Sequence, residues 1–380
     1  MISVDCNFPG GNIIVDSIEG ETIRVHQDVR DTEGDWFWFY FRVTNHDARK
    51  FTIQFTQSKI IGVRGPAVSE DGGATWAWLG AEAVRDNCAF DYQASSADAE
   101  VRFAFGLPYT RAHLDAFLSR QSFEGSFRAG VLCTSEKGRE VPLLRLGRLD
   151  GAGRYAVLLT ARHHCCESTP SFVLEGLIDA VLGSPEGAYL SGHAEIMIVP
   201  FMDLDGVEAG DQGKNRKPYD HNRDYEGESL YAPVRALRQM VPEWLAGRTL
   251  IAMDLHCPWI RGPHNECIYF VGSQNETNWA RVNDFSRVLE NCVRGELPFK
   301  VEDNLPYGQA WNVAGNYPRK SCSRWTSELP NAVFGSALEV PYANVRGAVV
   351  TPASARAFGN DLARALAQYL KTNPVAFRKE

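Results

Sequence analysis

The chain has 380 residues, of which 44% are hydrophobic and 23% are charged, so it has the composition of a folded protein and the length for two domains. Its 39 basic and 47 acidic side chains give a formal net charge of −8, which provides no basic field to attract nucleic acid or anionic lipid. No run approaches the ~20 apolar residues of a membrane helix, and residues 1–15 lack a secretory pattern. The nine cysteines include no Cys-x-x-Cys pair. We therefore expect a cytoplasmic protein without nucleic-acid or membrane partners.

The first 120 or so residues are rich in short aromatic and β-branched runs, separated by turn residues such as those at 71–73. Runs of this kind and spacing predict the strands of an antiparallel β-sandwich. The predicted strands are 12–15, 22–26, 36–44, 51–56, 76–79 and 101–105. A helix is predicted over 110–120, with Thr110 as its N-cap and Leu114 and Phe117 on its apolar side.

From about residue 130 onward, apolar strands alternate with amphipathic helices, a pattern typical of an α/β sheet with helices on its faces. The predicted strands are 155–161, 195–201, 249–255 and 336–340, and the predicted helices are 170–182, 230–245, 278–294 and 353–371. The change of pattern predicts two domains, an N-terminal β-sandwich at 1–125 and an α/β domain at 126–380.

Polar side chains follow or end three of the predicted strands, at the edge where an open α/β sheet places its ligand sites. His164 and Glu167 come after the first strand, Asp254 and His256 end the third, and Glu339 lies at the end of the last. Two histidines and a glutamate are ligands that catalytic zinc uses, with a fourth position left to water. An isolated His-x-x-Glu match is more often a polar strand end than a metal site. Here His256 and Glu339 at two other strand ends favour a metal site.

The segment after the second strand carries a further polar cluster, at 203–207, 213–217 and 220–225. Arg216 and Arg223 each follow an asparagine there, and their guanidinium groups offer fixed donors for a carboxylate or an oxyanion. The alternative is a solvated charged loop, which such a composition often forms.

These residues occur in the order seen in zinc carboxypeptidases of the M14 family, which the chain resembles. The matching motifs are His164-x-x-Glu167, Asp205-Gly206-Val207, Arg216, Asn222-Arg223, Asp254-Leu255-His256 and Glu339. Residues 36–45 and 103–110 also resemble segments of the cytosolic carboxypeptidases, in which a β-sandwich precedes the catalytic domain. The resemblance extends from residue 36 to the final helix and implies an α/β/α zinc carboxypeptidase domain with a mixed sheet.

The resemblance implies catalytic and metal-binding roles for five residues. His164, Glu167 and His256 would hold one Zn²⁺ per chain, and Glu339 would act as general base towards the water that zinc activates. Arg216 would polarise the scissile carbonyl and stabilise the oxyanion.

The same resemblance assigns residues to substrate binding. Asn222 and Arg223 would bind the terminal carboxylate, which makes the enzyme an exopeptidase. Tyr317, 22 positions before the predicted general base, has the spacing of the mobile tyrosine of digestive members, with Tyr342 as the alternative. Arg324, 15 positions before the same glutamate, falls where side-chain specificity is set in related enzymes and would favour acidic residues.

We therefore expect a zinc carboxypeptidase that releases C-terminal residues, acidic ones above all, from peptides or proteins. A second hypothesis is an aspartoacylase-like zinc amidohydrolase, against which the aromatic β-sandwich argues. A third is a non-catalytic peptide-binding relative, which would have no need of a general base such as Glu339. No serine-hydrolase elbow, P-loop or strand-linked dinucleotide motif occurs, which weakens other enzyme classes.

Overall fold

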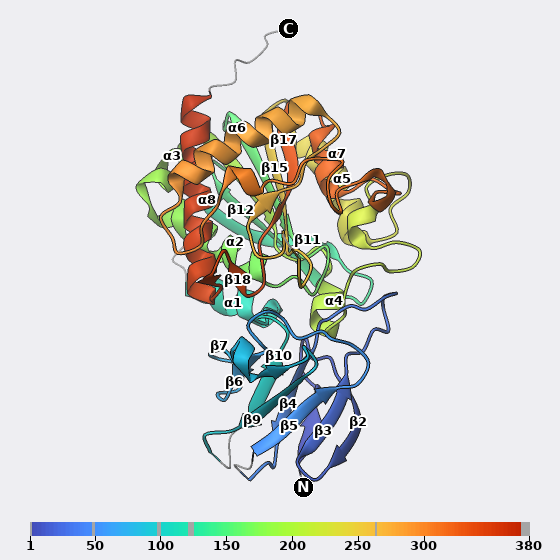
Figure 1. Cartoon of the computed structure of the whole chain (residues 1–380). Coiled ribbons are helices and arrows are strands. Elements are labelled where there is room, and N and C mark those ends of the chain that lie inside the picture. The colour runs from blue at the N-terminus through green and yellow to red at the C-terminus, as the bar shows by residue number, and fades with distance from the viewer. Residues whose placement is uncertain (1, 48–49, 97–99, 121–124, 263, 374–380) are drawn as a thin grey trace.

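The computed structural model describes residues 2–47, 50–96, 100–120, 125–262 and 264–373. The chain forms two lobes, a smaller one made of the N-terminal strands and a larger one made of a central sheet with helices (Figure 1). This arrangement confirms the predicted fold class, in which N-terminal antiparallel sheets precede an α/β unit with a mixed sheet.

The N-terminal lobe contains two sheets of five strands each. In spatial order, the first consists of β1 (Ser3–Asp5), β4 (Tyr40–Thr44), β10 (Val101–Ala104), β6 (Ala67–Ser69) and β7 (Ala77–Trp78). The second consists of β2 (Ile14–Glu19), β3 (Thr22–His26), β5 (Lys50–Phe55), β9 (Ala89–Gln93) and β8 (Val84–Arg85), and its β3 and β5 pair in parallel. Side chains from both sheets, among them Phe41, Phe51 and Phe103, share one buried core, which explains the period-2 pattern of the sequence.

The larger lobe is built on a seven-stranded sheet with the order β11-β12-β14-β13-β15-β17-β16. Its parallel strands are β14 (Ala194–Val199), β13 (Tyr155–Ala161), β15 (Thr249–His256) and β17 (Ala332–Glu339). Antiparallel strands at the two sides are β11 (Phe127–Thr134), β12 (Glu140–Gly147) and β16 (Tyr269–Phe270), and a ribbon of β18 (Asn344–Val345) and β19 (Ala348–Val349) follows β17. Strands β13, β14 and β15 are buried along their whole length, as expected where helices cover both faces.

Helices lie on both faces of this sheet (Figure 1). One group packs together, consisting of α2 (Thr169–Gly183), α3 (Pro185–His193), α6 (Glu276–Cys292) and α8 (Pro352–Thr372). On the other face, α5 (Ala232–Leu245) contacts β11, and α7 (Cys322–Ser327) contacts β15 and β17. The shorter helices are α1 (Arg111–Ser119), α4 (Leu204–Ala209), η1 (Ala81–Ala83), η2 (His221–Arg223), η3 (Val301–Asp303) and η4 (Ala314–Asn316).

The predicted elements lie close to the observed ones, and the predicted strand 155–161 coincides with β13. Residues 36–39 were predicted as strand, but the backbone N–H of Trp38 donates to Oε1 of Gln212 at 2.7 Å instead of to a neighbouring strand. Strand β11 was not predicted, because most of its side chains are exposed and show no apolar alternation.

Helix α1 begins after Thr110, the predicted N-cap. Its buried side chains Leu114 and Phe117 belong to the core of the larger lobe, although the helix precedes that lobe's first strand. The division of the chain into domains at 125/126 stays a prediction.

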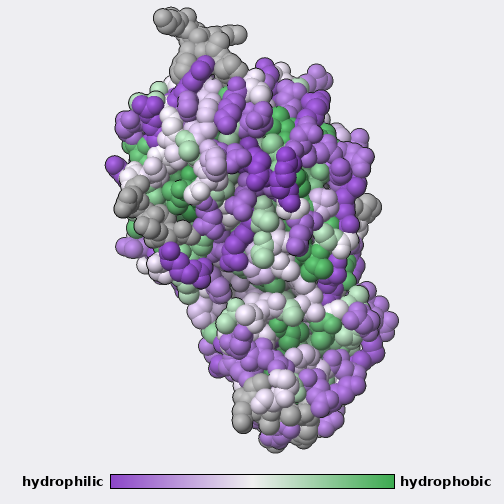
Figure 2. Space-filling model, turned by 90° about the vertical axis from the view of Figure 1, so that its left-hand side faces the viewer, coloured by the Kyte–Doolittle hydropathy of each residue, from purple (hydrophilic) through white to green (hydrophobic). Residues whose placement is uncertain are grey.

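The two lobes contact each other along the loop that follows α4. Nη2 of Arg30 pairs with Oδ1 of Asp211 at 2.6 Å, and Nε2 of Gln212 donates to the carbonyl oxygen of Trp38 at 2.9 Å. Seen from the side of α3, the surface is mostly hydrophilic, with hydrophobic residues in separate small groups (Figure 2). None of the helices in the described parts of the chain has the length and apolar character needed to cross a membrane.

Candidate functional site

The candidate site lies at the carboxyl edge of the seven-stranded sheet, where β13, β15 and β17 end as neighbours. His256 is the last residue of β15 and Glu339 is the last residue of β17, and the two are direct partners in the strand register. The strand ends thus meet as the sequence predicts.

The loop after β13 is shaped by a buried arginine. Arg162 has a φ of +61°, and its guanidinium donates to the carbonyl oxygens of Cys165 and Tyr109, each at 2.9 Å. These bonds hold the short turn in which His164 and Glu167 follow one another before α2.

His164, Glu167 and His256 form a group whose ligand atoms lie within 4.8 Å of one another. Oε1 of Glu167 lies 3.0 Å from Nδ1 of His164, and Oε2 lies 2.7 Å from Nδ1 of His256. Burial would raise the pKa of Glu167, but Lys214 and the two histidines hold it well below its ordinary value, so the carboxylate is charged. Two imidazole nitrogens and a charged carboxylate are donors that zinc takes in catalytic sites, so the group fits such an ion.

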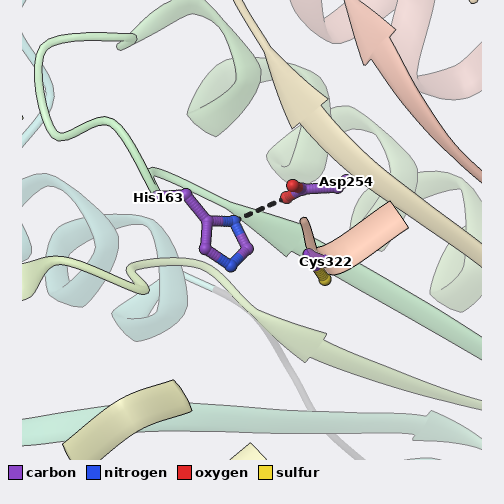
Figure 3. A group of neighbouring side chains, drawn as sticks. All are labelled: His163, Asp254 and Cys322. Carbon is purple, nitrogen blue, oxygen red and sulfur yellow. Dashed lines mark hydrogen bonds and ion pairs between the residues drawn. The ribbon is translucent and has the colours of Figure 1, made fainter. Parts of the chain in front are cut away.

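His163, Asp254 and Cys322 form a second group of potential ligands (Figure 3). Its atoms already have protein partners: Nδ1 of His163 lies 2.7 Å from Oδ1 of Asp254, and Nε2 lies 2.6 Å from the hydroxyl of Tyr225. Sγ of Cys322 lies 3.6 Å from the hydroxyl of Thr160. This group is therefore a satisfied, buried hydrogen-bond network rather than a second open metal site.

Asp254 connects this network to the first group. Its Oδ2 lies 2.7 Å from Nε2 of His256, which leaves Nδ1 of the same ring directed at Glu167. Burial would raise the pKa of Asp254, but His163 and His256 hold it well below its ordinary value. A charged carboxylate on Nε2 fixes the orientation of His256, the usual support of a metal-binding histidine.

Glu339 lies beside the metal-ligand group. Unlike Glu167, it has a carboxylate oxygen without a hydrogen-bond partner among the described residues. That oxygen is Oε2, and the residue is 7% exposed. Burial raises the pKa of Glu339 to about 7, with His256 opposing and Glu167 adding to the shift. Such a carboxyl group can accept and return a proton near neutrality.

The structure places Arg216 among carboxylates outside this group. Its Nε lies 2.9 Å from Asp31, its Nη1 2.5 Å from Asp203 and its Nη2 3.1 Å from Asp211. Because Asp31 belongs to the N-terminal lobe, Arg216 connects the two lobes.

A cation that sequence reasoning missed, Lys214, lies directly against the metal-ligand group. Its Nζ is 2.5 Å from Oε1 of Glu167 and 5.0 Å from the centre of the Trp36 ring. No motif distinguishes Lys214 from an ordinary loop lysine, so only the neighbouring Gly213, which marks a turn, could have drawn attention to it.

Asn222 and Arg223 reach the site on η2. Nδ2 of Asn222 lies 3.2 Å from Nε2 of His256, and its Oδ1 accepts a bond from a backbone N–H of α7. The guanidinium of Arg223 donates to two carbonyl oxygens and lies 5.2 Å from the ring centre of Tyr317. Among the described residues no carboxylate pairs with Arg223, so its charge is available to a ligand.

A cavity of about 410 Å³ is lined by Tyr317 and Arg324. The hydroxyl of Tyr317 donates to Oδ1 of Asn312 at 2.9 Å. The Arg324 side chain is 56% exposed, and its Nε lies 3.1 Å from Oε1 of Glu328. Oε2 of the same carboxylate lies 2.5 Å from Nζ of Lys320. Further polar lining residues are Ser273, Gln274, Asn275, Ser321, Ser323, Ser327 and Ser336.

Tyr342, the alternative to Tyr317, is packed in the aromatic core between the lobes. Its ring centre lies 4.9 Å from that of Phe105 and 5.7 Å from that of Phe37, and its hydroxyl lies 3.8 Å from Sγ of Cys166. Of the two tyrosines, Tyr317 is the one that lines the cavity.

Comparison with known sequences finds the cytosolic carboxypeptidases. Cytosolic carboxypeptidase 3 of Mus musculus is 27% identical over 253 residues, which cover 58% of this chain and 25% of the mouse protein. Cytosolic carboxypeptidase 6 of Caenorhabditis elegans is 25% identical over 248 residues, which cover 58% of this chain and 54% of the worm protein. The chain thus spans between a quarter and about half of the length of these relatives, and no model of a protein family matches it.

Comparison with solved structures finds bacterial carboxypeptidases over nearly the whole chain. A metallo-carboxypeptidase from Burkholderia cenocepacia has a TM-score of 0.78 at 20% identity and covers 98% of this chain and 99% of its own. A metallo-carboxypeptidase from Pseudomonas aeruginosa, in complex with (2-guanidinoethylmercapto)succinic acid, has a TM-score of 0.78 at 21% identity, with 97% and 99% covered. The carboxypeptidase A of Helicoverpa armigera aligns with a TM-score of 0.54 at 16% identity over 73% of this chain and 76% of its own.

Proposed function

We propose that this chain, a relative of the cytosolic and bacterial M14-type metallocarboxypeptidases, hydrolyses the C-terminal residue of peptides or proteins with one zinc ion held by His164, Glu167 and His256. The observation that carries the proposal is the buried carboxyl of Glu339, whose Oε2 has no partner among the described residues, beside three potential metal ligands. A protein that only bound peptides would have no use for such a proton acceptor. The similarity to the cytosolic carboxypeptidases supports a cytoplasmic location.

The chain's own residues supply the proton transfers. A divalent ion held by the three ligands would supply Lewis-acid activation of water and of the carbonyl. Glu339 takes a proton from the attacking water as its oxygen bonds to the carbonyl carbon, and returns that proton to the amide nitrogen as the C–N bond breaks. Asp254 acts through His256, whose ring it holds by Nε2.

Removal of terminal residues requires recognition of the terminal carboxylate. Arg223 is the group that we assign to this carboxylate, since its guanidinium has carbonyl partners and no described carboxylate partner. Asn222 lies next to Arg223 and offers its side-chain amide to the same carboxylate. The ring of Tyr317 packs against the guanidinium of Arg223.

We further propose that the 410 Å³ cavity receives the side chain of the terminal residue and favours Glu or Asp. Arg324 and Glu328 both line the cavity, and the carboxylate of Glu328 is shared with Lys320, so it only partly neutralises the guanidinium of Arg324. Ser321 and Ser323 share one hydrogen bond, which leaves one of their two hydroxyl protons for a side-chain carboxylate. The hydroxyls of Ser273, Ser327 and Ser336 already donate to carbonyl oxygens.

The experiment that tests the function is a scan of peptides ending in Glu, Asp, Lys, Phe and Ala, with metal content measured on the same preparation. We expect release of the free terminal residue, fastest for Glu and Asp, by protein that holds one zinc per chain. Peptides with an amidated C-terminus are the matched controls and should not be cleaved. Zinc-loaded protein that releases nothing, or that cleaves amidated peptides equally well, contradicts the proposal.

The ligand set has its own test in His256→Ala. This variant should lose the metal, because removal of one of three protein ligands leaves two. Full zinc content in the purified variant would show that the ligand set is wrong.

A further inference from the structure

The loop after α4 contains two partly buried cations, Arg216 and Lys214, whose surroundings differ. All three nitrogens of the Arg216 guanidinium face carboxylates, those of Asp31, Asp203 and Asp211, at 2.5 to 3.1 Å. Asp211 also pairs with Arg30, so three carboxylates face two guanidinium groups and leave this cluster with a net negative charge, which repels an oxyanion. Arg216 is therefore poorly suited to stabilise negative charge on a substrate.

Lys214 lies two residues earlier and pairs with one carboxylate instead of three. Its side chain is 13% exposed, and its Nζ pairs with Oε1 of Glu167 at 2.5 Å. An ammonium has three donors, and one carboxylate oxygen occupies one of them. Glu339 is close enough for the charge of Lys214 to act on it, so the ammonium belongs to the same site as the proton acceptor.

The backbone explains why this lysine reaches the site. Gly213 has a φ of +78°, and a Cβ added there would lie 2.4 Å from the backbone nitrogen of Cys165. Only glycine permits this approach, which brings the loop of Lys214 against the turn that carries His164. The carbonyl oxygen of Lys214 also accepts a hydrogen bond from the hydroxyl of Thr32 in the N-terminal lobe.

From this geometry we infer that Lys214, rather than Arg216, is the cation that binds the carbonyl oxygen of the scissile bond. The inference rests on the proposed carboxypeptidase activity and assigns one of its catalytic groups. As the water oxygen bonds to the carbonyl carbon and its proton passes to Glu339, the C=O electron pair moves to the oxygen, and the ammonium of Lys214 stabilises that charge. When the C–N bond breaks, the carbonyl re-forms and the proton leaves with the amine.

The test compares Lys214→Met with Lys214→Arg and with the control Lys217→Met, whose side chain is 74% exposed. Lys214→Met should lower kcat by about 10²–10³, the usual scale for one lost oxyanion donor, while keeping one zinc per chain. Lys214→Arg should recover part of the loss, and Lys217→Met should match the wild type.

A second measurement is independent of turnover. A peptide phosphonate carries a tetrahedral anion, so its affinity should fall in Lys214→Met by a factor similar to that in kcat, while Lys217→Met binds it as the wild type does. Wild-type kcat and phosphonate affinity in zinc-loaded Lys214→Met would overturn the inference. Loss of zinc from that variant would also overturn it, because Lys214 would then support only the metal ligands. Failure of the proposed function is distinct, since the wild type itself would then cleave none of the peptides.

Discussion

Two charged clusters lie close together at the carboxyl edge of the sheet, and they differ in how completely their groups are paired. In the first, Arg216 is surrounded by carboxylates from both lobes. In the second, Glu339 keeps a buried oxygen without a described partner beside the potential metal ligands. Since buried polar groups are normally paired, the difference supports our proposals that the first cluster stabilises the fold and that the second binds metal and substrate.

The largest expected effect comes from removing the unpaired carboxyl. Glu339→Gln should lower turnover by ~10²–10⁴, the usual contribution of a general base, while retaining the fold and the metal. Steady-state kinetics on a Glu-ending peptide, with zinc measured on the same sample, checks this. A variant of undiminished turnover would remove Glu339 from the mechanism.

The paired cluster should respond in stability rather than in chemistry. Arg216→Met leaves three carboxylates around an uncharged side chain, so we expect the free energy of unfolding to fall by about 3–5 kcal/mol. Chemical denaturation measures the loss, and kcat per folded molecule should change much less than in Lys214→Met. An Arg216→Met protein of wild-type stability and greatly reduced kcat would reverse the roles of the two clusters.

The raised pKa of Glu339 predicts a pH dependence in the metal-free protein. Its folded-state pKa of about 7 lies above the ordinary value of 4.5, so the folded protein binds this proton more tightly than the unfolded chain does. The free energy of unfolding should therefore fall, relative to that of Glu339→Gln, as the pH rises from about 4.5 to about 7. Denaturation of both metal-free proteins at pH 4.5, 6 and 8 checks this sign. If the difference in free energy of unfolding between the two proteins stays constant across these pH values, burial does not raise the pKa of Glu339.

The smallest effect is expected at the exposed edge of the cavity. Arg324→Ala should lower kcat/KM for Glu-ending peptides by about tenfold more than for Leu-ending ones, a modest factor because the guanidinium is more than half exposed. Glu328→Gln is the matched variant. It removes the carboxylate that pairs with Arg324, so kcat/KM for Glu-ending peptides should rise relative to that for Leu-ending ones. An unchanged ratio in both variants would place side-chain recognition elsewhere.

The sequence allowed the strand-end part of the site to be predicted, because parallel strands bring their carboxyl ends to one edge. His256 and Glu339 end neighbouring strands, so their positions follow from local pattern and topology alone. The roles of Arg216 and Lys214 could not be separated in this way. They depend on Asp31, which lies in the other lobe and far away in the sequence, and on the turn at Gly213.

We propose that the cluster containing Glu339 is a one-metal hydrolytic site, and a zinc titration of metal-free protein tests this most directly. Release of terminal Glu should rise in proportion to added zinc and level off at one equivalent per chain. Glu339→Gln should bind the same single equivalent with release lowered at least ~10²-fold. Full release before any zinc is added, or one bound equivalent with no release by the wild type, would contradict the account.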